Sequence, residues 1–159
     1  MTTASVPSGY LLCDGYPNVD DYVHLRRAAG LTPKNAEQAA AAIRGSWAGC
    51  FVAEAARPDT AIAMGRIVGD GGWYFVVADM AVLPAHQRRG LGDAILQRLL
   101  AKIRDEAAGG DAYVTLSADE PGRRLYERRG FQDSMPKEMG MAMVMKDCGR
   151  QLKQEHQGS

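Results

Sequence analysis

Apolar and polar positions along this chain repeat with two different periods. The helical period is clearest in residues 91–103, where leucines and isoleucines recur every fourth residue, the spacing of one helix face. Residues 73–83 are instead almost continuously apolar and are followed by Pro84, which has no N–H with which to continue a strand ladder. The two periods predict a domain that mixes helices and strands.

The whole pattern predicts ten elements in the order β-α-α-β-β-β-α-β-α-β. Strands are expected at residues 9–17, 47–55, 61–69, 73–83, 112–118 and 140–146, and helices at residues 18–30, 32–45, 91–108 and 121–130. Asn18 and Thr32 are the expected helix caps, and residues 57–60 form the expected turn between the second and third strands. The predicted fold class is therefore α/β (α+β), with a mixed sheet that is mostly antiparallel in its first half.

Size and charge restrict the class of protein. A length of 159 residues suits one domain, expected at residues 1–148, followed by a polar, flexible tail at 149–159. Nineteen basic residues balance nineteen acidic ones, which argues against nucleic-acid or anionic-membrane partners. No apolar run approaches the roughly 20 residues of a membrane span, and no signal-peptide pattern begins the chain, so we expect a cytoplasmic protein. Three dispersed cysteines and three histidines predict neither a disulfide framework nor a metal site.

Two arginines and two glycines stand where the apolar strand at 73–83 gives way to the periodic helix. The stretch is Gln87-Arg88-Arg89-Gly90-Leu91-Gly92. Free N–H groups at a helix start bind anions, and glycine lets the backbone approach a phosphate closely. The spacing matches neither Walker A nor the dinucleotide-binding turn. The pattern indicates a phosphate site, and an exposed turn before a glycine-capped helix is the alternative.

These residues carry a resemblance to a known family. "VLPAHQRRGLGDAIL" resembles motif A of the GNAT superfamily of acetyl-CoA-dependent N-acetyltransferases, and "RRLYERRGF" resembles the family's fourth helix. The resemblance extends over the element order from about Gly9 to Met145 and implies a single GNAT-like domain, with helices on both faces of a sheet that is splayed at its fourth strand. The sequence departs from the family at Asp119 and Gly122, where Asn and Ala are frequent.

The resemblance also implies a set of site residues and a chemistry. Tyr126 would protonate or hydrogen-bond the departing thiolate, since a phenol stays protonated at pH 7, and the amine would attack acetyl-CoA directly, without an acyl-enzyme. Tyr126 is otherwise a packing residue on a short helix. Acetyl-CoA would be bound by Met80, Ala81, Val82, Gln87, Arg88, Arg89, Gly90, Leu91, Gly92, Asp93 and Tyr126.

The general base stays open between several candidates. Asp79 lies in an apolar strand, where burial would raise its basicity, and we assign it a catalytic role, with a structural aspartate as the alternative. Glu54 is the second candidate. His24 has a suitable ordinary pKa but is expected at the surface. Proton loss through ordered water is equally compatible with the sequence.

The acceptor is expected to be a small primary amine that carries an apolar or aromatic group, as for arylalkylamine N-acetyltransferases, which the chain also resembles. Alternating methionines in the last predicted strand would be core or a soft wall of the acceptor pocket; they are Met139, Met141, Met143 and Met145. Further aromatic surface is expected from Trp47, Trp73, Tyr74 and Phe75. Protein, polyamine or aminoglycoside acceptors, and a non-catalytic acyl-CoA sensor, are the alternatives. The resemblance implies a homodimer as well.

Overall fold

Five strands form one sheet in the order β1-β2-β3-β4-β5, as seen in the computed structural model, which describes residues 4–138, 140–146 and 148. Pairing is antiparallel from β1 to β4, and β5 lies parallel to β4. The strands are β1 (Tyr10–Asp14), β2 (Ala48–Glu54), β3 (Arg57–Gly69), β4 (Tyr74–Val82) and β5 (Tyr113–Thr115). This mixed, mostly antiparallel sheet confirms the predicted fold class.

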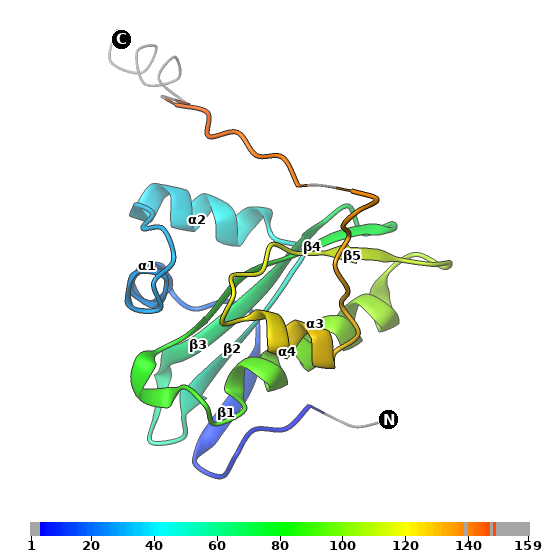
Figure 1. Cartoon of the computed structure of the whole chain (residues 1–159). Coiled ribbons are helices and arrows are strands. Elements are labelled where there is room, and N and C mark those ends of the chain that lie inside the picture. The colour runs from blue at the N-terminus through cyan, green and yellow to red at the C-terminus, as the bar shows by residue number, and fades with distance from the viewer. Residues whose placement is uncertain (1–3, 139, 147, 149–159) are drawn as a thin grey trace, which may run out of the picture.

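Among the described residues, four α-helices cover the sheet, two on each face (Figure 1). They are α1 (Val19–Ala28), α2 (Ala36–Gly45), α3 (Leu91–Glu106) and α4 (Arg123–Arg128), with a short 3₁₀ turn η1 (Pro84–His86) before α3. One apolar cluster joins α3 to β2, β3 and β4, and a second joins α1 and α2 to the opposite face. Within the described residues, no helix is long and apolar enough to cross a membrane.

Local signals at helix starts and turns agree with the structure in part. Asn18 caps α1 as predicted, accepting a hydrogen bond from the Asp21 N–H at 2.8 Å. Thr32 does not cap α2; Asn35 does, in a reciprocal capping box with Gln38. The turn between β2 and β3 lies at residues 55–56 rather than 57–60, because β3 begins at Arg57 and extends the hairpin.

A bulge in β4 shapes the middle of the sheet. Met64 pairs with Ala81 and Arg66 with Ala78, so two residues, Asp79 and Met80, stand opposite Gly65 alone. Asp79 has a φ of 56°, a left-handed conformation that is strained for a residue with a side chain. Extra residues of this kind bend a strand and re-aim its neighbours.

Strand β4 also separates from β5 beyond the bulge. The two strands pair from Tyr74 to Val76, whereas β4 continues to Val82. The backbone of β4 from Val77 onward therefore has no ladder partner on the β5 side within the described residues. This is the splayed sheet that the resemblance implied.

The last predicted strand is not present. Residues 140–146 form no strand and extend away from the body (Figure 1). Met141, Met143 and Met145 are 97%, 82% and 71% exposed, so neither the core nor the pocket-wall interpretation of these methionines holds within one chain. Met139 and the predicted tail at 149–159 lie outside the described residues.

Candidate active site

The arginine–glycine turn lies between the splayed end of β4 and the start of α3. Gly90 caps α3 with a φ of 78°, and Arg88 also adopts a left-handed φ of 61°. Only glycine reaches this conformation without a steric cost. No side chain caps the first turn of α3. The first N–H groups of the helix therefore point outward without an acceptor from a capping side chain. The turn thus presents backbone donors at the positive end of a 16-residue helix.

Side chains around the turn are held by specific contacts. The Arg89 Nη1 donates to the Tyr10 hydroxyl at 3.0 Å, and this hydroxyl shares a 2.9 Å hydrogen bond with the His86 Nδ1. The Gln87 Nε2 donates to the Val82 carbonyl at 3.1 Å, tying the turn to the end of β4. The Arg88 side chain is exposed and has no such contact among the described residues. Two cationic groups therefore flank the free N–H groups.

Asp93, in the first turn of α3, has a different environment from the other turn residues. Its carboxylate forms a two-pronged ion pair with Arg129 at the end of α4, one hydrogen bond being 2.6 Å long, and it also accepts a hydrogen bond from Gln97. The Arg129 guanidinium holds the pKa of Asp93 below its usual range. The side chain thus joins α3 to α4, and only the Asp93 N–H faces the anion site.

The bulge places Asp79 and Met80 on opposite faces of the sheet. A side chain at Gly65 would come within 2.5 Å of the Met80 Sδ, and Met80 packs with the α3 cluster. Ala81 is buried against α1 and α2. Residues Met80 to Val82 thus lie in the part of β4 that pairs with β3 but has no β5 partner, next to the Gln87 contact at Val82.

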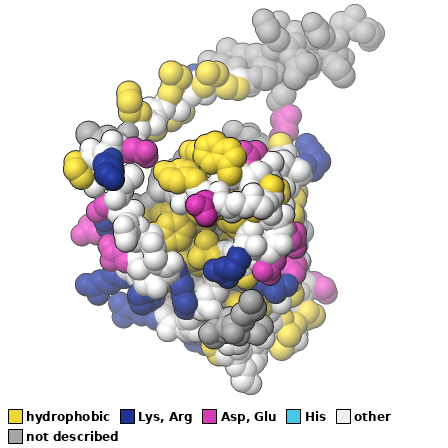
Figure 2. Space-filling model, turned by 90° about the vertical axis from the view of Figure 1, so that its right-hand side faces the viewer, with side chains coloured by type: hydrophobic (Ala, Val, Ile, Leu, Met, Phe, Trp, Pro, Cys, Tyr) yellow, Lys and Arg dark blue, Asp and Glu magenta, His cyan; other side chains and the backbone are white. Residues whose placement is uncertain are grey.

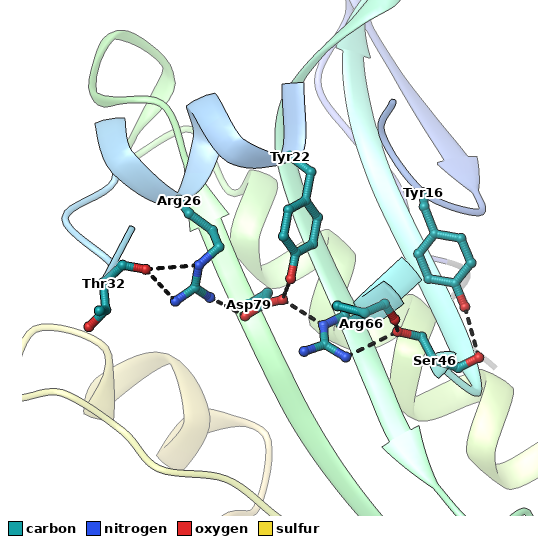
Figure 3. Close-up of polar contacts among 8 residues, drawn as sticks. Tyr16, Tyr22, Arg26, Thr32, Ser46, Arg66 and Asp79 are labelled. Carbon is teal, nitrogen blue, oxygen red and sulfur yellow. Dashed lines mark hydrogen bonds and ion pairs between the residues drawn. The ribbon is translucent and has the colours of Figure 1, made fainter. Parts of the chain in front are cut away.

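Asp79 is the centre of a nearly buried polar network (Figure 3). Its carboxylate accepts a hydrogen bond from the Tyr22 hydroxyl and pairs with the guanidinium groups of Arg26 and Arg66, the latter through Nε at 2.5 Å. The side chain of Asp79 is 7% exposed, and those of Arg26 and Arg66 are 11% and 17% exposed. Burial, followed by the neighbouring Asp79, raises the pKa of Tyr22.

The two arginines extend this network into the surrounding loops. Arg26 donates twice to the Thr32 carbonyl, at 3.1 and 2.7 Å, which fixes the chain after α1. Arg66 donates to the Ser46 Oγ at 3.1 Å, after α2. These contacts match the alternative in which Asp79 is a structural aspartate, because its carboxylate joins α1, β3 and the bulge of β4.

The other candidate bases lie elsewhere. Glu54, at the end of β2, forms an ion pair with Arg57, and the hydrogen bond from Arg57 lowers the pKa of Glu54, which makes it a weaker base. Glu54 pairs across the sheet with Tyr10, whose hydroxyl contacts His86 and Arg89, so Glu54 lies on the side of the arginine–glycine turn. His24 is exposed on α1, as expected. The structure does not bring Glu54 or His24 into contact with Asp79.

Tyr126 stands on α4, half-buried at the edge of the α3 cluster. Its ring meets that of Phe131 edge-on, with centroids 6.0 Å apart. Burial, followed by the charge of Asp119, raises the pKa of Tyr126 above its usual value of 10. The phenol therefore keeps its proton across the neutral range.

The two departures from the family, Asp119 and Gly122, explain each other. The Asp119 Oδ1 accepts a hydrogen bond from the Gly122 N–H at 3.0 Å, which starts α4. A Cβ at position 122 would lie 2.7 Å from the same Oδ1 and 3.2 Å from the Tyr126 ring. Glycine at 122 thus makes room for both the Asp119 carboxylate and the Tyr126 ring.

The four aromatic residues that were expected near the acceptor lie instead in the core and at the exposed start of β4. Phe75 is fully buried and packs on Trp47 with ring centroids 4.9 Å apart, so both belong to the core. Trp73 and Tyr74 are exposed at the start of β4, where Tyr74 meets Tyr113 of β5. The apolar side chains that do lie near Asp79 come from α1 and the sheet face under it, among them Tyr22, Leu25 and Met64.

A cavity of about 1000 Å³ lies on the outer side of β5, away from the arginine–glycine turn. It is bounded by the end of α3, by β5, by α4 and by residues 131–138. Figure 2 shows hydrophobic side chains inside this hollow and above it. The hollow exists because the sheet ends at β5, with no strand on its outer side among the described residues.

Comparisons with known proteins give a family and several relatives. Residues 46–133 match the family model described as an acetyltransferase (GNAT) domain. A stretch of 60 residues, 38% of this chain, is 38% identical to the GCN5-like protein acetyltransferase Rv2170 of Mycobacterium tuberculosis, and the match spans 29% of that relative's length.

Solved structures resemble almost the whole domain. A probable acetyltransferase of unknown function from meticillin-resistant Staphylococcus aureus is 31% identical, with a TM-score of 0.79 over 86% of this chain and 99% of that one. A GNAT family acetyltransferase from Streptococcus pneumoniae is 24% identical, with a TM-score of 0.69 over 87% and 99% of the two chains. The second likeness concerns the fold alone.

Proposed function

This chain belongs to the GNAT family of acetyltransferases, and we propose that it transfers the acetyl group of acetyl-CoA to a small primary amine that carries an apolar or aromatic group. The observation that carries the proposal is the left-handed Gly90 at the start of α3, beside the splayed end of β4. Acetyl-CoA supplies an activated thioester, and the residues of this chain bind it and manage the protons.

The arginine–glycine turn fits the pyrophosphate of acetyl-CoA. The N–H groups of Leu91, Gly92 and Asp93 face outward at the positive helix end, and Arg88 and Arg89 supply charge. A Cβ at Gly92 would only touch Leu125 and Val82, at 3.6 and 3.7 Å, so the left-handed Gly90 is the position that fixes the backbone. Charged hydrogen bonds from such donors contribute about 1.5–3 kcal/mol each.

Two groups would act on the thioester itself. Those N–H groups of Met80 to Val82 that point to the side without a β5 partner would face the carbonyl oxygen, where a donor aimed at a developing oxyanion contributes about 3 kcal/mol. As the amine attacks and the carbon–sulfur bond breaks, the Tyr126 hydroxyl would give its hydrogen bond or proton to the leaving sulfur. The raised pKa of Tyr126 supports this role, since the phenol remains a donor at neutral pH.

The amine proton would pass to water rather than to Asp79. Protonating Asp79 would leave Arg26 and Arg66, both largely buried, facing a neutral group, which is costly. Glu54 has a lowered pKa and lies toward the arginine–glycine turn. We therefore assign Asp79 to holding the bulge in β4, and the proton to solvent at the mouth of the site.

The charges near the bulge support an apolar amine over a polycation. Two guanidinium groups face one carboxylate at Asp79, so the local balance is positive and repels spermidine or an aminoglycoside. Asp21 is already used, since its carboxylate accepts a hydrogen bond from the Ala61 N–H at 2.9 Å. The partly buried apolar side chains at the edge of the cluster of Tyr22, Leu25 and Met64, among them Leu31 and Leu83, instead offer packing to a hydrophobic group.

A thiol-release assay with paired acceptors tests the proposal. Phenethylamine and tryptamine should release thiol from acetyl-CoA at least tenfold faster than spermidine or kanamycin at equal concentration. The opposite order would refute the apolar-amine assignment and leave the family assignment intact. A lysine peptide belongs in the same panel, because the partial relative from M. tuberculosis is named a protein acetyltransferase. Acetyl-CoA binding without thiol release for any amine would instead identify a sensor.

A further inference from the structure

The Tyr10 hydroxyl contacts two side chains at the arginine–glycine turn, although Tyr10 lies on β1, at the opposite edge of the sheet from β5. It is 2.9 Å from the His86 Nδ1 and 3.0 Å from the Arg89 Nη1. We propose that Tyr10 is a positioning residue for acetyl-CoA, because it holds the Arg89 guanidinium in place before the pyrophosphate binds. This inference rests on the proposed binding of acetyl-CoA at the turn.

The chemistry of the three groups fixes the direction of both hydrogen bonds. A guanidinium has only donors, so the Tyr10 hydroxyl accepts the hydrogen bond from Arg89. The single hydrogen of the hydroxyl is then free for the Nδ1 of a neutral His86 that carries its proton on Nε2. Hydrogen bonds in such a chain polarise and strengthen one another. One hydroxyl therefore restrains both the 3₁₀ turn η1 and the arginine that follows it.

Tyr10 is itself firmly placed. Its backbone pairs with Glu54 of β2, and its N–H donates to the Pro7 carbonyl at 3.2 Å. Its ring packs against the α3 cluster and meets the His86 ring edge-on, with centroids 5.8 Å apart. The His86 N–H donates to the Leu83 carbonyl at 2.9 Å, just after β4. The hydroxyl thus links a fixed point on β1 to the turn that follows β4.

The two arginines of the turn differ in this restraint. Both are exposed, but only Arg89 is held by a hydrogen bond within the described part of the chain. Ordering a long side chain is one of the costs of binding, and a restraint that acts before the ligand arrives removes part of it. A guanidinium has five N–H donors and Tyr10 occupies a single one, so the others remain for phosphate oxygens. Arg89 should therefore contribute more to acetyl-CoA binding than Arg88.

Calorimetry of the full chain with acetyl-CoA and S-acetylpantetheine tests this role. Tyr10→Phe keeps the ring and its packing but removes the hydroxyl, and it should weaken acetyl-CoA binding about fivefold, the effect of one lost hydrogen bond. Affinity for S-acetylpantetheine, which lacks the pyrophosphate, should stay the same, and in turnover the change should appear in KM and not in kcat. Tyr16→Phe is the matched control, because the Tyr16 hydroxyl donates to the Ser46 carbonyl at 3.4 Å; it should bind acetyl-CoA like the wild type.

A double-variant cycle separates positioning of Arg89 from a general effect on structure. Arg89→Ala should weaken acetyl-CoA binding more than Arg88→Ala. If Tyr10 acts through Arg89, adding Tyr10→Phe to Arg89→Ala should cause no further loss. The same loss from Tyr10→Phe in both backgrounds would overturn the proposal. Tighter binding by Tyr10→Phe would also overturn it, because Tyr10 would then be withholding Arg89 from the ligand.

The wild-type protein distinguishes a failure of this proposal from a failure of the proposed function. If the wild type binds acetyl-CoA no more tightly than S-acetylpantetheine, the turn does not hold the pyrophosphate, and both assignments fail. If the wild type prefers acetyl-CoA and Tyr10→Phe keeps the full preference, only the role of Tyr10 fails.

Discussion

Replacing Asp79 with asparagine separates a structural role from a catalytic one. Asparagine keeps the shape of the side chain but removes the charge that pairs with Arg26 and Arg66. Both guanidinium groups are largely buried and would lose their counter-charge. Removing one partner of a buried ion pair typically costs about 3–5 kcal/mol, and the retained side-chain oxygen of asparagine places the expected loss at about 3 kcal/mol.

This loss is measurable by thermal unfolding. For a chain of this size, each kcal/mol lowers Tm by about 2–4 °C, so Asp79→Asn should lower Tm by about 6–12 °C. Assayed well below that temperature, kcat should fall less than tenfold, since the bulge keeps its shape. Loss of a general base would instead lower kcat by about 10²–10⁴.

Asp14→Asn is the matched control. Asp14 also pairs with an arginine, Arg98, but both side chains are about half exposed, at 46% and 44%. Exposed pairs contribute little, so this variant should unfold at nearly the wild-type temperature. An unchanged Tm for Asp79→Asn, together with a kcat lowered at least a hundredfold, would refute the structural role and restore Asp79 as the base.

Three further predictions concern the acetyl-CoA site. Tyr126→Phe should lower kcat at least tenfold and leave acetyl-CoA affinity nearly unchanged, because the hydroxyl acts mainly in the transition state; equal turnover would remove Tyr126 from the mechanism. Gly90→Val should weaken acetyl-CoA binding at least tenfold in calorimetry. Gly110→Val should not, because Gly110 also has a positive φ, of 114°, but lies beyond the other end of α3. Because burial raises the pKa of Tyr126, kcat should decline through loss of the phenol proton only above pH 10; a decline centred below pH 9 that is absent in Tyr126→Phe would contradict this.

Elements with strong local signals were predictable from the sequence. The fourfold repeat of leucine and isoleucine in residues 91–103 and the Asn18 cap required only neighbouring residues. The arginine–glycine turn was recognisable for the same reason, since its function depends on backbone conformation within six positions. The structure adds the left-handed φ of Gly90 at the start of α3.

Where two neighbouring residues gave equally good local signals, the sequence did not show which of them the structure would use, because contacts with distant residues decide. Thr32 and Asn35 are both good helix caps, and the Thr32 carbonyl is instead held by Arg26. The sequence drew attention to Asp79 as a carboxylate in an apolar strand. Its partners Arg26 and Arg66 lie 53 and 13 residues away, and the bulge that brings them together exists only in the paired sheet.

The last strand shows a different limit. The alternating pattern of residues 140–146 predicts a strand correctly only if a sheet edge is available to it, and periodicity does not say which edge. In the single chain the segment remains exposed. Local pattern therefore predicts that a segment can form a strand, while pairing depends on contacts with residues distant in the sequence.

The most direct test of the account compares acetyl-CoA with S-acetylpantetheine, which keeps the thioester and lacks the pyrophosphate. If the turn at Arg88 to Gly92 holds that pyrophosphate, calorimetry should show acetyl-CoA binding at least about 100-fold more tightly, the worth of two charged hydrogen bonds. The difference should shrink with added salt. Equal affinities for the two ligands would contradict the assignment of this turn and, with it, the central claim about how the protein binds its acetyl donor.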